Sequence, residues 1–362
     1  MRRAVVDQAH LRNDEARMVQ KSIENWYSNT QDSSFSLNGE FNLVTSVGCV
    51  RDSNQDRIGV LHVASSSVSF LCACVCDGMG GLKNGDLAAS KGIAAFFSEL
   101  IKSRRLQPVE RLEHALQYAN RQVSEHYPGG GSTLSAALIE SGDIYIANVG
   151  DSRIFGFSVS GELVRLTIDD TMSERYGADS RGLLQYLGLK KDLKPDIQKV
   201  SGDFTSIILA SDGCYSIGET AMKALQESCS DALIFSKRAV ELSKWFGGHD
   251  NSSIIFIPNV HKATGLSDFS SDVSVFSTLG RMKMEWVHED NTPPVGERHH
   301  RIVQAKADSS EPDAEDVRPK VARPKRPRTS TTKKPRDKAT SKTVMEPDQQ
   351  FSIGFDDDEG GQ

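Results

Sequence analysis

Residues 72–81 read CACVCDGMGG, an apolar run that stops at an aspartate and a glycine-rich turn. The run continues upstream through Val68 and predicts a buried strand that ends at the turn. Asp77 is therefore expected at the end of a central strand, beside a glycine that leaves the neighbouring carbonyl oxygen open. Such a carboxylate suits a hard divalent cation, although an Asp-Gly pair taken alone is more often the start of a β-turn.

Three further aspartates stand beside short, β-branched apolar runs. Asp56 precedes the run 58–61, Asp212 follows the run 206–210, and Asp250 precedes the run 254–257. All four carboxylates are thus expected at strand ends. Because burying several carboxylates together is costly unless something neutralises them, we expect a bound metal ion among them.

Together with two glycine-containing turns, these motifs resemble the type 2C, metal-dependent Ser/Thr protein phosphatase family. Six pieces occur in the family's order: Arg51-x-x-Asn54-x-Asp56, Asp77-Gly78-Met79-Gly80-Gly81, Gly131-Ser132-Thr133, Gly150-Asp151-Ser152-Arg153, Ser211-Asp212-Gly213 and Asp250-Asn251. They cover residues 41–258, and neither end of the chain is included. Each piece alone is common, whereas six in order at family-like intervals form a specific signal. The compact core and the DGMGG form favour bacterial members.

The order of expected elements points to an α+β fold. Strands are expected over 41–45, 58–63, 68–76, 134–140, 144–149, 153–159, 163–166, 207–210 and 253–257, and helices over 7–26, 86–101, 108–126, 220–228 and 230–246. Two consecutive helices between blocks of strands predict layers instead of alternating βαβ units. The resemblance implies a layered α-β-β-α sandwich, in which helices flank two central antiparallel sheets.

The resemblance also implies a site for two Mg²⁺ or Mn²⁺ ions. In that site Asp77 bridges both ions, Asp212 and Asp250 hold the first, and the backbone carbonyl of Gly78 contributes to the second. Ligands that are all oxygen favour these two metals over zinc. Two such ions lower the pKa of a bridging water and neutralise charge as phosphorus is attacked in line.

Other site residues follow the family less closely. Gln55 stands where many members have Glu, so Asp56 becomes the candidate that holds the second ion through waters. Arg51 is expected to clamp the substrate phosphate with its planar donor fork. Met79 replaces a histidine that some members use as an acid. Asp151 resembles the ligand of a third, weaker ion, and capping its own turn is an equal alternative.

The predicted activity is hydrolysis of phosphoserine or phosphothreonine in proteins, on targets of a Ser/Thr kinase. The alternative is a catalytically silent scaffold that binds phosphoproteins, which Gln55 and Met79 support. The polar interval 167–200 is either the flap that the family has beside its active site or an ordinary surface loop. The glycine-rich turn 129–133 lacks a nucleotide-binding pattern and is expected to be a tight turn.

Three regions are expected: a helical extension over 1–40, the phosphatase domain over 41–260, and a low-complexity, largely disordered tail over 261–362. The extension either packs on the domain or docks a partner. Within the tail, residues 318–342 hold eleven Lys or Arg and one Asp, a net charge of +10, and residues 356–359 form an acidic tip. The basic segment is interpreted as a solvated linker, a tether, a localisation signal or a docking arm.

Composition limits the remaining classes of function. The chain has a net charge of −6, so the residues outside the basic segment carry −16 and the body should repel nucleic acid, which only the tail could bind. Six cysteines, three of them alternating over 72–76, are expected to be reduced core residues, with a zinc site as the minority alternative. The absence of a long apolar stretch predicts a cytoplasmic protein without membrane association.

Overall fold

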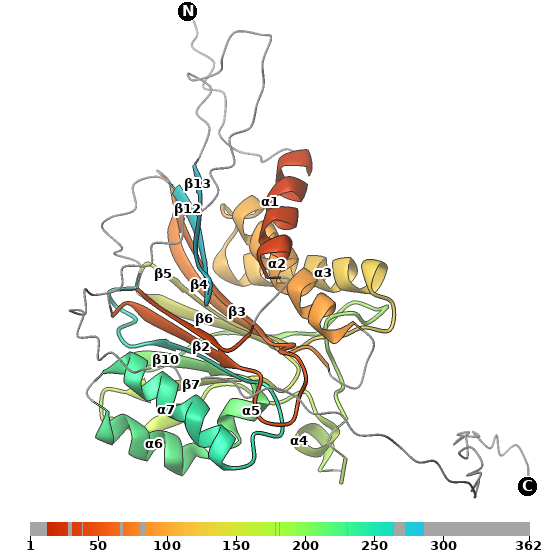
Figure 1. Ribbon diagram of the computed structural model, residues 1–362. Coiled ribbons are helices and arrows are strands. Elements are labelled where there is room, and N and C mark those ends of the chain that lie inside the picture. The colour runs from red at the N-terminus through yellow and green to blue at the C-terminus, as the bar shows by residue number, and fades with distance from the viewer. Residues whose placement is uncertain are drawn as a thin grey trace, which may run out of the picture. The chain divides into compact units, whose positions relative to one another are not determined.

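The computed structural model describes residues 13–27, 31–37, 39–65, 68–79, 84–177, 179–180, 182–229, 231–263 and 272–285. Within these residues two antiparallel sheets are stacked and helices lie on their outer faces (Figure 1). The predicted α-β-β-α sandwich is confirmed. Gly80, Gly81, Arg181 and everything after residue 285, including the basic segment and the acidic tip, lie outside the described residues.

One sheet has six strands and the other has seven. The six-stranded sheet runs in the order β1 (Ser33–Leu37), β2 (Phe41–Ser46), β11 (Ser252–Ile257), β10 (Phe204–Ala210), β7 (Arg153–Ser158) and β8 (Leu163–Arg165). The seven-stranded sheet runs in the order β13 (Gly280–Glu285), β12 (Asp272–Ser277), β3 (Arg57–Ala64), β4 (Ser69–Cys76), β5 (Leu134–Glu140), β6 (Asp143–Val149) and β9 (Asp196–Lys199).

Strand β4 explains why the opening stretch is apolar at almost every position. Leu71, Ala73 and Val75 face the six-stranded sheet, where they join a core with Phe41 and Ile255. Because successive side chains of a strand point to opposite faces, the three cysteines face the helices instead. Both faces of β4 are therefore buried. All six cysteines are free thiols, but the predicted core position holds only for Cys214 and the three of β4, because Cys49 is exposed and Cys229 is half-buried.

Helices cover the outer face of each sheet. Helices α2 (Gly85–Lys102) and α3 (Pro108–His126) pack on the seven-stranded sheet, while α6 (Glu219–Ser228) and α7 (Ala232–Trp245) pack on the other (Figure 1). Two short helices, α4 (Met172–Tyr176) and α5 (Asp212–Tyr215), lie in connecting segments. These four long helices match the predicted ones to within two residues, because their apolar periodicity is local to each helix. Of the helix predicted over 7–26, residues 7–12 lie outside the described residues.

The division at residue 40 needs correction. Helix α1 (Asn13–Trp26) packs with α2 and α3, and Ile23 and Tyr27 are buried in the same core as the cysteines. A Cβ added to Gly59 of β3 would collide with the Tyr27 hydroxyl, so the two residues fit only because position 59 is glycine. Strand β1, which was not predicted, pairs with β2. The described part of the segment therefore belongs to the folded domain.

The boundary at residue 260 is also too early. Strand β12 pairs with β3 through Val273↔Val63 and Val275↔Leu61, and the side chains of Val273, Val275 and Phe276 are buried. Strand β13 then pairs with β12 and forms an edge of the seven-stranded sheet. The sequence shows only two short apolar runs here, too little signal to separate a hairpin from a polar tail. The sandwich therefore extends at least to residue 285.

Candidate active site

The four aspartates lie at the ends of two pairs of neighbouring strands. Asp56 precedes β3 and Asp77 follows β4, which is its partner in the sheet. Asp212 follows β10 and Asp250 precedes β11, and these two strands also pair with each other. Asp77 experiences the charges of Asp56, Asp212, Asp151 and Asp250 together, so these carboxylates lie in one place. The four aspartates thus lie at strand ends and within electrostatic range of one another.

Asp77 is held through its backbone by the glycine-rich turn. Its N–H donates to Oγ1 of Thr133 at 3.0 Å, and its carbonyl accepts from the N–H of Thr133 at 2.8 Å. Burial, together with the neighbouring carboxylates, raises the pKa of Asp77 well above its ordinary value. The turn that the sequence left without a role thus fixes the central carboxylate.

Asp56 is fully buried and only partly satisfied. Ser211 donates to its Oδ2 at 2.8 Å. Burial and, to a lesser extent, the charges of Asp212 and Asp250 raise the pKa of Asp56 to about 7, against the lowering effect of the Ser253 and Ser211 hydroxyls. Within the described residues its Oδ1 is buried and has no hydrogen-bond partner. An unpaired carboxylate oxygen in a buried cluster is the kind of group that a cation satisfies.

The donor set fits small divalent cations. In the part of the chain that is described, Oδ1 of Asp212 is likewise buried without a partner. The backbone at Gly78 is tightly enclosed, since an added Cβ would lie 2.5 Å from the carbonyl oxygen of Gly85. Carboxylates beside a backbone carbonyl are the ligands that Mg²⁺ and Mn²⁺ prefer. The residues present therefore suit the predicted metals.

The carboxylates are not arranged as a complete metal-coordination site. No group of three or more His, Cys, Asp or Glu among the described residues could hold a metal ion as it stands. Asp250 supplies one reason, because Nη2 of Arg51 donates to its Oδ2 at 2.6 Å and the N–H of Asn251 donates to its Oδ1 at 2.8 Å. The carboxylate predicted to hold the first ion is thus paired with the guanidinium predicted to hold phosphate.

Asn251 and Asn54 support the site in roles that sequence reasoning missed. Asn251 donates to the carbonyls of Val47 and Ser53 and accepts from the N–H of Gln55, so its amide ties the Arg51 loop to the Asp250 loop. Asn54 accepts from the N–H of Asp56 and donates to Thr45. Both residues belong to the family-like motifs described in the sequence analysis. Their position within those motifs was the sequence signal that could have identified their supporting roles.

Asp151 lies beside the cluster. Burial and, to a lesser extent, the nearby charges of Asp212 and Asp169 raise its pKa to about 7. Tyr215 donates to the backbone carbonyl of Asp151 at 3.0 Å, and the Arg153 guanidinium lies 4.0 Å from the centre of the Tyr215 ring. The Asp151 carboxylate therefore lies within electrostatic range of Asp212, while Tyr215 fixes the backbone of the turn.

Residues 167–200 are anchored by backbone hydrogen bonds to the glycine-rich turn 129–133. This interval is less irregular than predicted, since it contains α4 and β9. Leu187 exchanges two backbone hydrogen bonds with Ser132, and Ser132 in turn forms a bridge with Gly78. Helix α3 holds the far side of the interval, because Asn120 bonds Gly188 and Lys191 through both ends of its amide.

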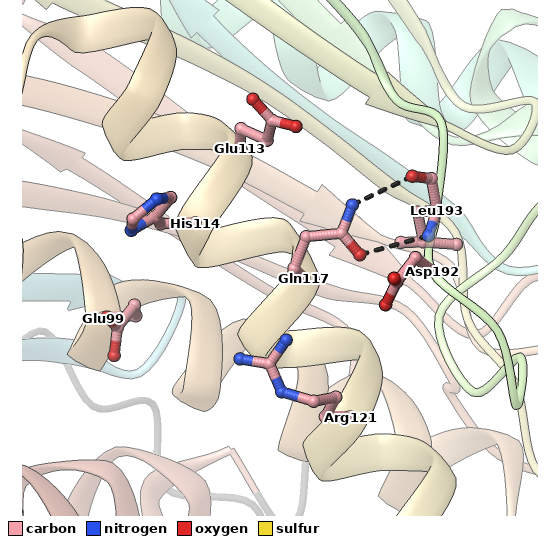
Figure 2. A pocket seen from close by; sticks show the side chains of 7 residues that line it. All are labelled: Glu99, Glu113, His114, Gln117, Arg121, Asp192 and Leu193. Carbon is pink, nitrogen blue, oxygen red and sulfur yellow. Dashed lines mark hydrogen bonds between the residues drawn. The ribbon is translucent and has the colours of Figure 1, made fainter.

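Two cavities lie beside this interval, and neither is lined by the predicted site residues. The first, of about 540 Å³, is lined by Glu99, Glu113, His114, Gln117, Arg121, Asp192 and Leu193. Figure 2 shows Gln117 of α3 reaching across it to both backbone groups of Leu193. The second, of about 650 Å³, is lined mostly by α4 and residues 184–196.

None of the described helices is both long and apolar enough to cross a bilayer. Comparison with known proteins finds relatives that match a little more than half of this chain. The serine/threonine phosphatase stp of Listeria monocytogenes is 27% identical over 241 residues, which cover 59% of this chain and 93% of that protein. The serine/threonine protein phosphatase PstP of Mycobacterium tuberculosis is 26% identical over 234 residues, 58% of this chain and 42% of that protein.

Solved structures show the same fold. A serine/threonine phosphatase of S. agalactiae superposes with a TM-score of 0.52 at 22% identity, covering 60% of this chain and 98% of that one. The catalytic domain of PstP in complex with two manganese ions gives a TM-score of 0.50 at 24% identity, covering 60% and 96%. A family model for protein phosphatase 2C matches residues 50–245, which is more than half of the chain. The protein therefore belongs to the protein phosphatase 2C family of phosphoprotein phosphatases, in its bacterial form.

Proposed function

We propose that the protein removes phosphate from phosphoserine and phosphothreonine side chains of proteins that a Ser/Thr kinase has modified, using two Mg²⁺ or Mn²⁺ ions. The observation that carries the proposal is the buried carboxylate cluster, in which Asp56 and Asp212 each keep an unpaired oxygen. A buried anionic cluster with unpaired oxygens is unfavourable by itself and becomes favourable once cations are bound. The PstP structure with two manganese ions supports the choice of metal.

Each carboxylate has a proposed place. Asp77 lies at the centre, Asp212 and Asp250 hold the first ion, and Asp56 with the carbonyl of Gly78 serves the second. When bound, the ions lower the pKa of water and neutralise the charge of the phosphoryl group. Asp151 is the proposed ligand of a weaker third ion that shares Asp212.

The chain's own residues orient the substrate. Arg51 is about two fifths exposed at the edge of the cluster, so its guanidinium can turn from Asp250 to the phosphate oxygens. Met79 carries no dissociable proton. We therefore propose that the leaving alkoxide takes its proton from solvent and not from the side chain at position 79.

The test uses the full chain and two substrates, a phosphothreonine peptide and p-nitrophenyl phosphate. We expect turnover of both with Mn²⁺ and its loss with EDTA. Asp77→Asn and Asp212→Asn should each lower kcat by at least about 100-fold. The exposed Asp231, which caps α7, provides the matched control, because Asp231→Asn changes a surface carboxylate far from the cluster in the chain.

A scaffold that binds phosphoproteins without turnover is the competing function. Calorimetry separates the two, because a scaffold would bind Mn²⁺ and phosphopeptide and release no phosphate. Near wild-type activity in Asp77→Asn or Asp212→Asn would contradict the proposed site.

A further inference from the structure

Three large apolar side chains are exposed next to the carboxylate cluster in the chain. Trp245 is 87% exposed, the largest fraction among the bulky apolar residues of the described segments, and Phe246 and Val50 are each 62% exposed. Trp245 is the last residue of α7, and Phe246 caps the helix. The helix already buries Phe235, Ala239 and Val240 against the six-stranded sheet. Its packing therefore does not require an aromatic pair at the exposed end.

The two segments that carry these side chains also carry Arg51 and Asp250. Val50 directly precedes Arg51, and Phe246 is four residues before Asp250. The segments are locked together, since the N–H of Cys49 donates to the carbonyl of Gly248 at 2.8 Å. An added Cβ on Gly48 would lie 2.9 Å from that same carbonyl, which leaves no room between the loops.

Chain geometry limits the distance between the aromatic pair and the reacting phosphate. Consecutive Cα atoms are about 3.8 Å apart, so Phe246 and Trp245 lie within about 15 and 19 Å of Asp250. A bound peptide advances about 3.3 Å per residue when extended. Side chains within about five residues of the phosphorylated residue can therefore reach the aromatic pair.

We propose that Val50, Trp245 and Phe246, here called the aromatic rim, form a docking surface for a bulky apolar side chain of the substrate, within five residues of the phosphorylated Ser or Thr. The inference rests on the proposed phosphatase function and names the sequence class that it selects. Exposed aromatic residues bury large area at little cost in side-chain entropy and are enriched where proteins bind partners. The occupant is assigned to the substrate because the rim is continuous with the loops of Arg51 and Asp250.

The experiment measures selectivity among phosphothreonine peptides. Each peptide has Leu or Ser at one position between five residues before and five residues after the phosphothreonine. For the wild-type full chain with Mn²⁺, we expect Leu to raise kcat/KM about tenfold over Ser at one or two positions, the effect of burying one apolar side chain. Trp245→Ser and Phe246→Ser should each reduce that ratio toward 1.

Val159→Ser provides the matched control. Val159 is 71% exposed and lies just beyond the end of β7 that is opposite to Asp151, about 20 Å along the strand. This variant should keep the Leu/Ser ratio of the wild type. Two results would overturn the docking surface without contradicting the phosphatase activity. One is a Leu/Ser ratio that stays unchanged in both aromatic variants, and the other is a wild-type enzyme that prefers Leu at no position.

Two further outcomes would also overturn the docking surface. If neither the peptides nor p-nitrophenyl phosphate is hydrolysed, the proposed function itself fails and the docking surface fails with it. If sedimentation shows a dimer that Trp245→Ser converts to monomer, the rim binds a second copy of this chain and the substrate proposal is overturned.

Discussion

The guanidinium Nη2 of Arg51 lies 2.6 Å from Oδ2 of Asp250, so a predicted phosphate ligand and a predicted metal ligand neutralise each other. Both side chains are about a third exposed or more, and a pair that is so exposed contributes little to stability. The pair nevertheless places a positive charge on a carboxylate that would otherwise face cations. Arg51 therefore competes with the metal for Asp250, and Asp250 competes with the substrate phosphate for Arg51.

The first prediction concerns Arg51→Ala. Removing the guanidinium should lower kcat/KM for a phosphothreonine peptide by about 10- to 100-fold, because a charged hydrogen bond to phosphate contributes about 1.5–3 kcal/mol. The same change should tighten Mn²⁺ binding a few-fold, because a cation beside Asp250 repels the metal. Steady-state kinetics and calorimetry measure the two effects. Weaker binding of both substrate and Mn²⁺ would show that Arg51 does not compete with the metal.

The second prediction is a dependence of stability on pH. The pKa of Asp56 is raised to about 7 by burial, whereas an aspartate in an unfolded chain titrates near 3.9. The folded state thus binds more protons than the unfolded state between about pH 4 and 7. In EDTA, the contribution of this group to the free energy of unfolding is present at low pH and is lost as pH rises through that window.

Mn²⁺ should counter this loss, because it replaces the proton as the neutralising charge. Thermal unfolding from pH 5 to 8, with EDTA or with Mn²⁺, should show metal stabilisation that increases with pH. Asp56→Asn removes one of the titrating groups and should reduce the slope of the profile in EDTA, while the raised pKa values of Asp77, Asp151 and Asp212 leave a smaller slope. A wild-type slope in that variant would assign the pH dependence to other carboxyls.

The third prediction concerns the contact between Tyr27 and Gly59. Tyr27→Ala should destabilise the fold by about 3–5 kcal/mol, since a large aromatic side chain leaves the core. Gly59→Ala should also destabilise, because the added methyl group meets the Tyr27 hydroxyl and the carbonyl of Phe276. In a Tyr27→Phe background the cost of Gly59→Ala should be smaller. Additive costs in urea unfolding of the double variant would show that the two residues do not interact.

The fourth prediction places the C-terminal limit of the fold. A chain that ends at residue 260 loses the three buried side chains of β12, which contribute roughly 1.5–3 kcal/mol each. The sum is comparable to the whole stability of a typical domain, so we expect this chain to aggregate. A chain that ends at residue 290 should keep the wild-type melting temperature and hydrolyse p-nitrophenyl phosphate at the wild-type rate. A stable, active chain ending at 260 would restore the boundary drawn from sequence.

The sequence alone determined those features that depend on neighbouring residues. Helix α3 begins at Pro108 and ends at His126, as its apolar periodicity predicts. Asp77 ends a buried strand because the apolar run stops at a glycine-rich turn, and that signal is local too. Six motifs in order then sufficed to identify the family and its α-β-β-α sandwich.

Tertiary structure decided which distant residues meet. Strand β12 pairs with β3, which lies far earlier in the chain, and neither Val273 nor Val63 carries a signal for the other. The ion pair of Arg51 and Asp250 and the contact of Tyr27 with Gly59 likewise join segments that are far apart in the chain. Such contacts depend on shape and charge complementarity across the folded core, which periodicity and motif spacing do not encode.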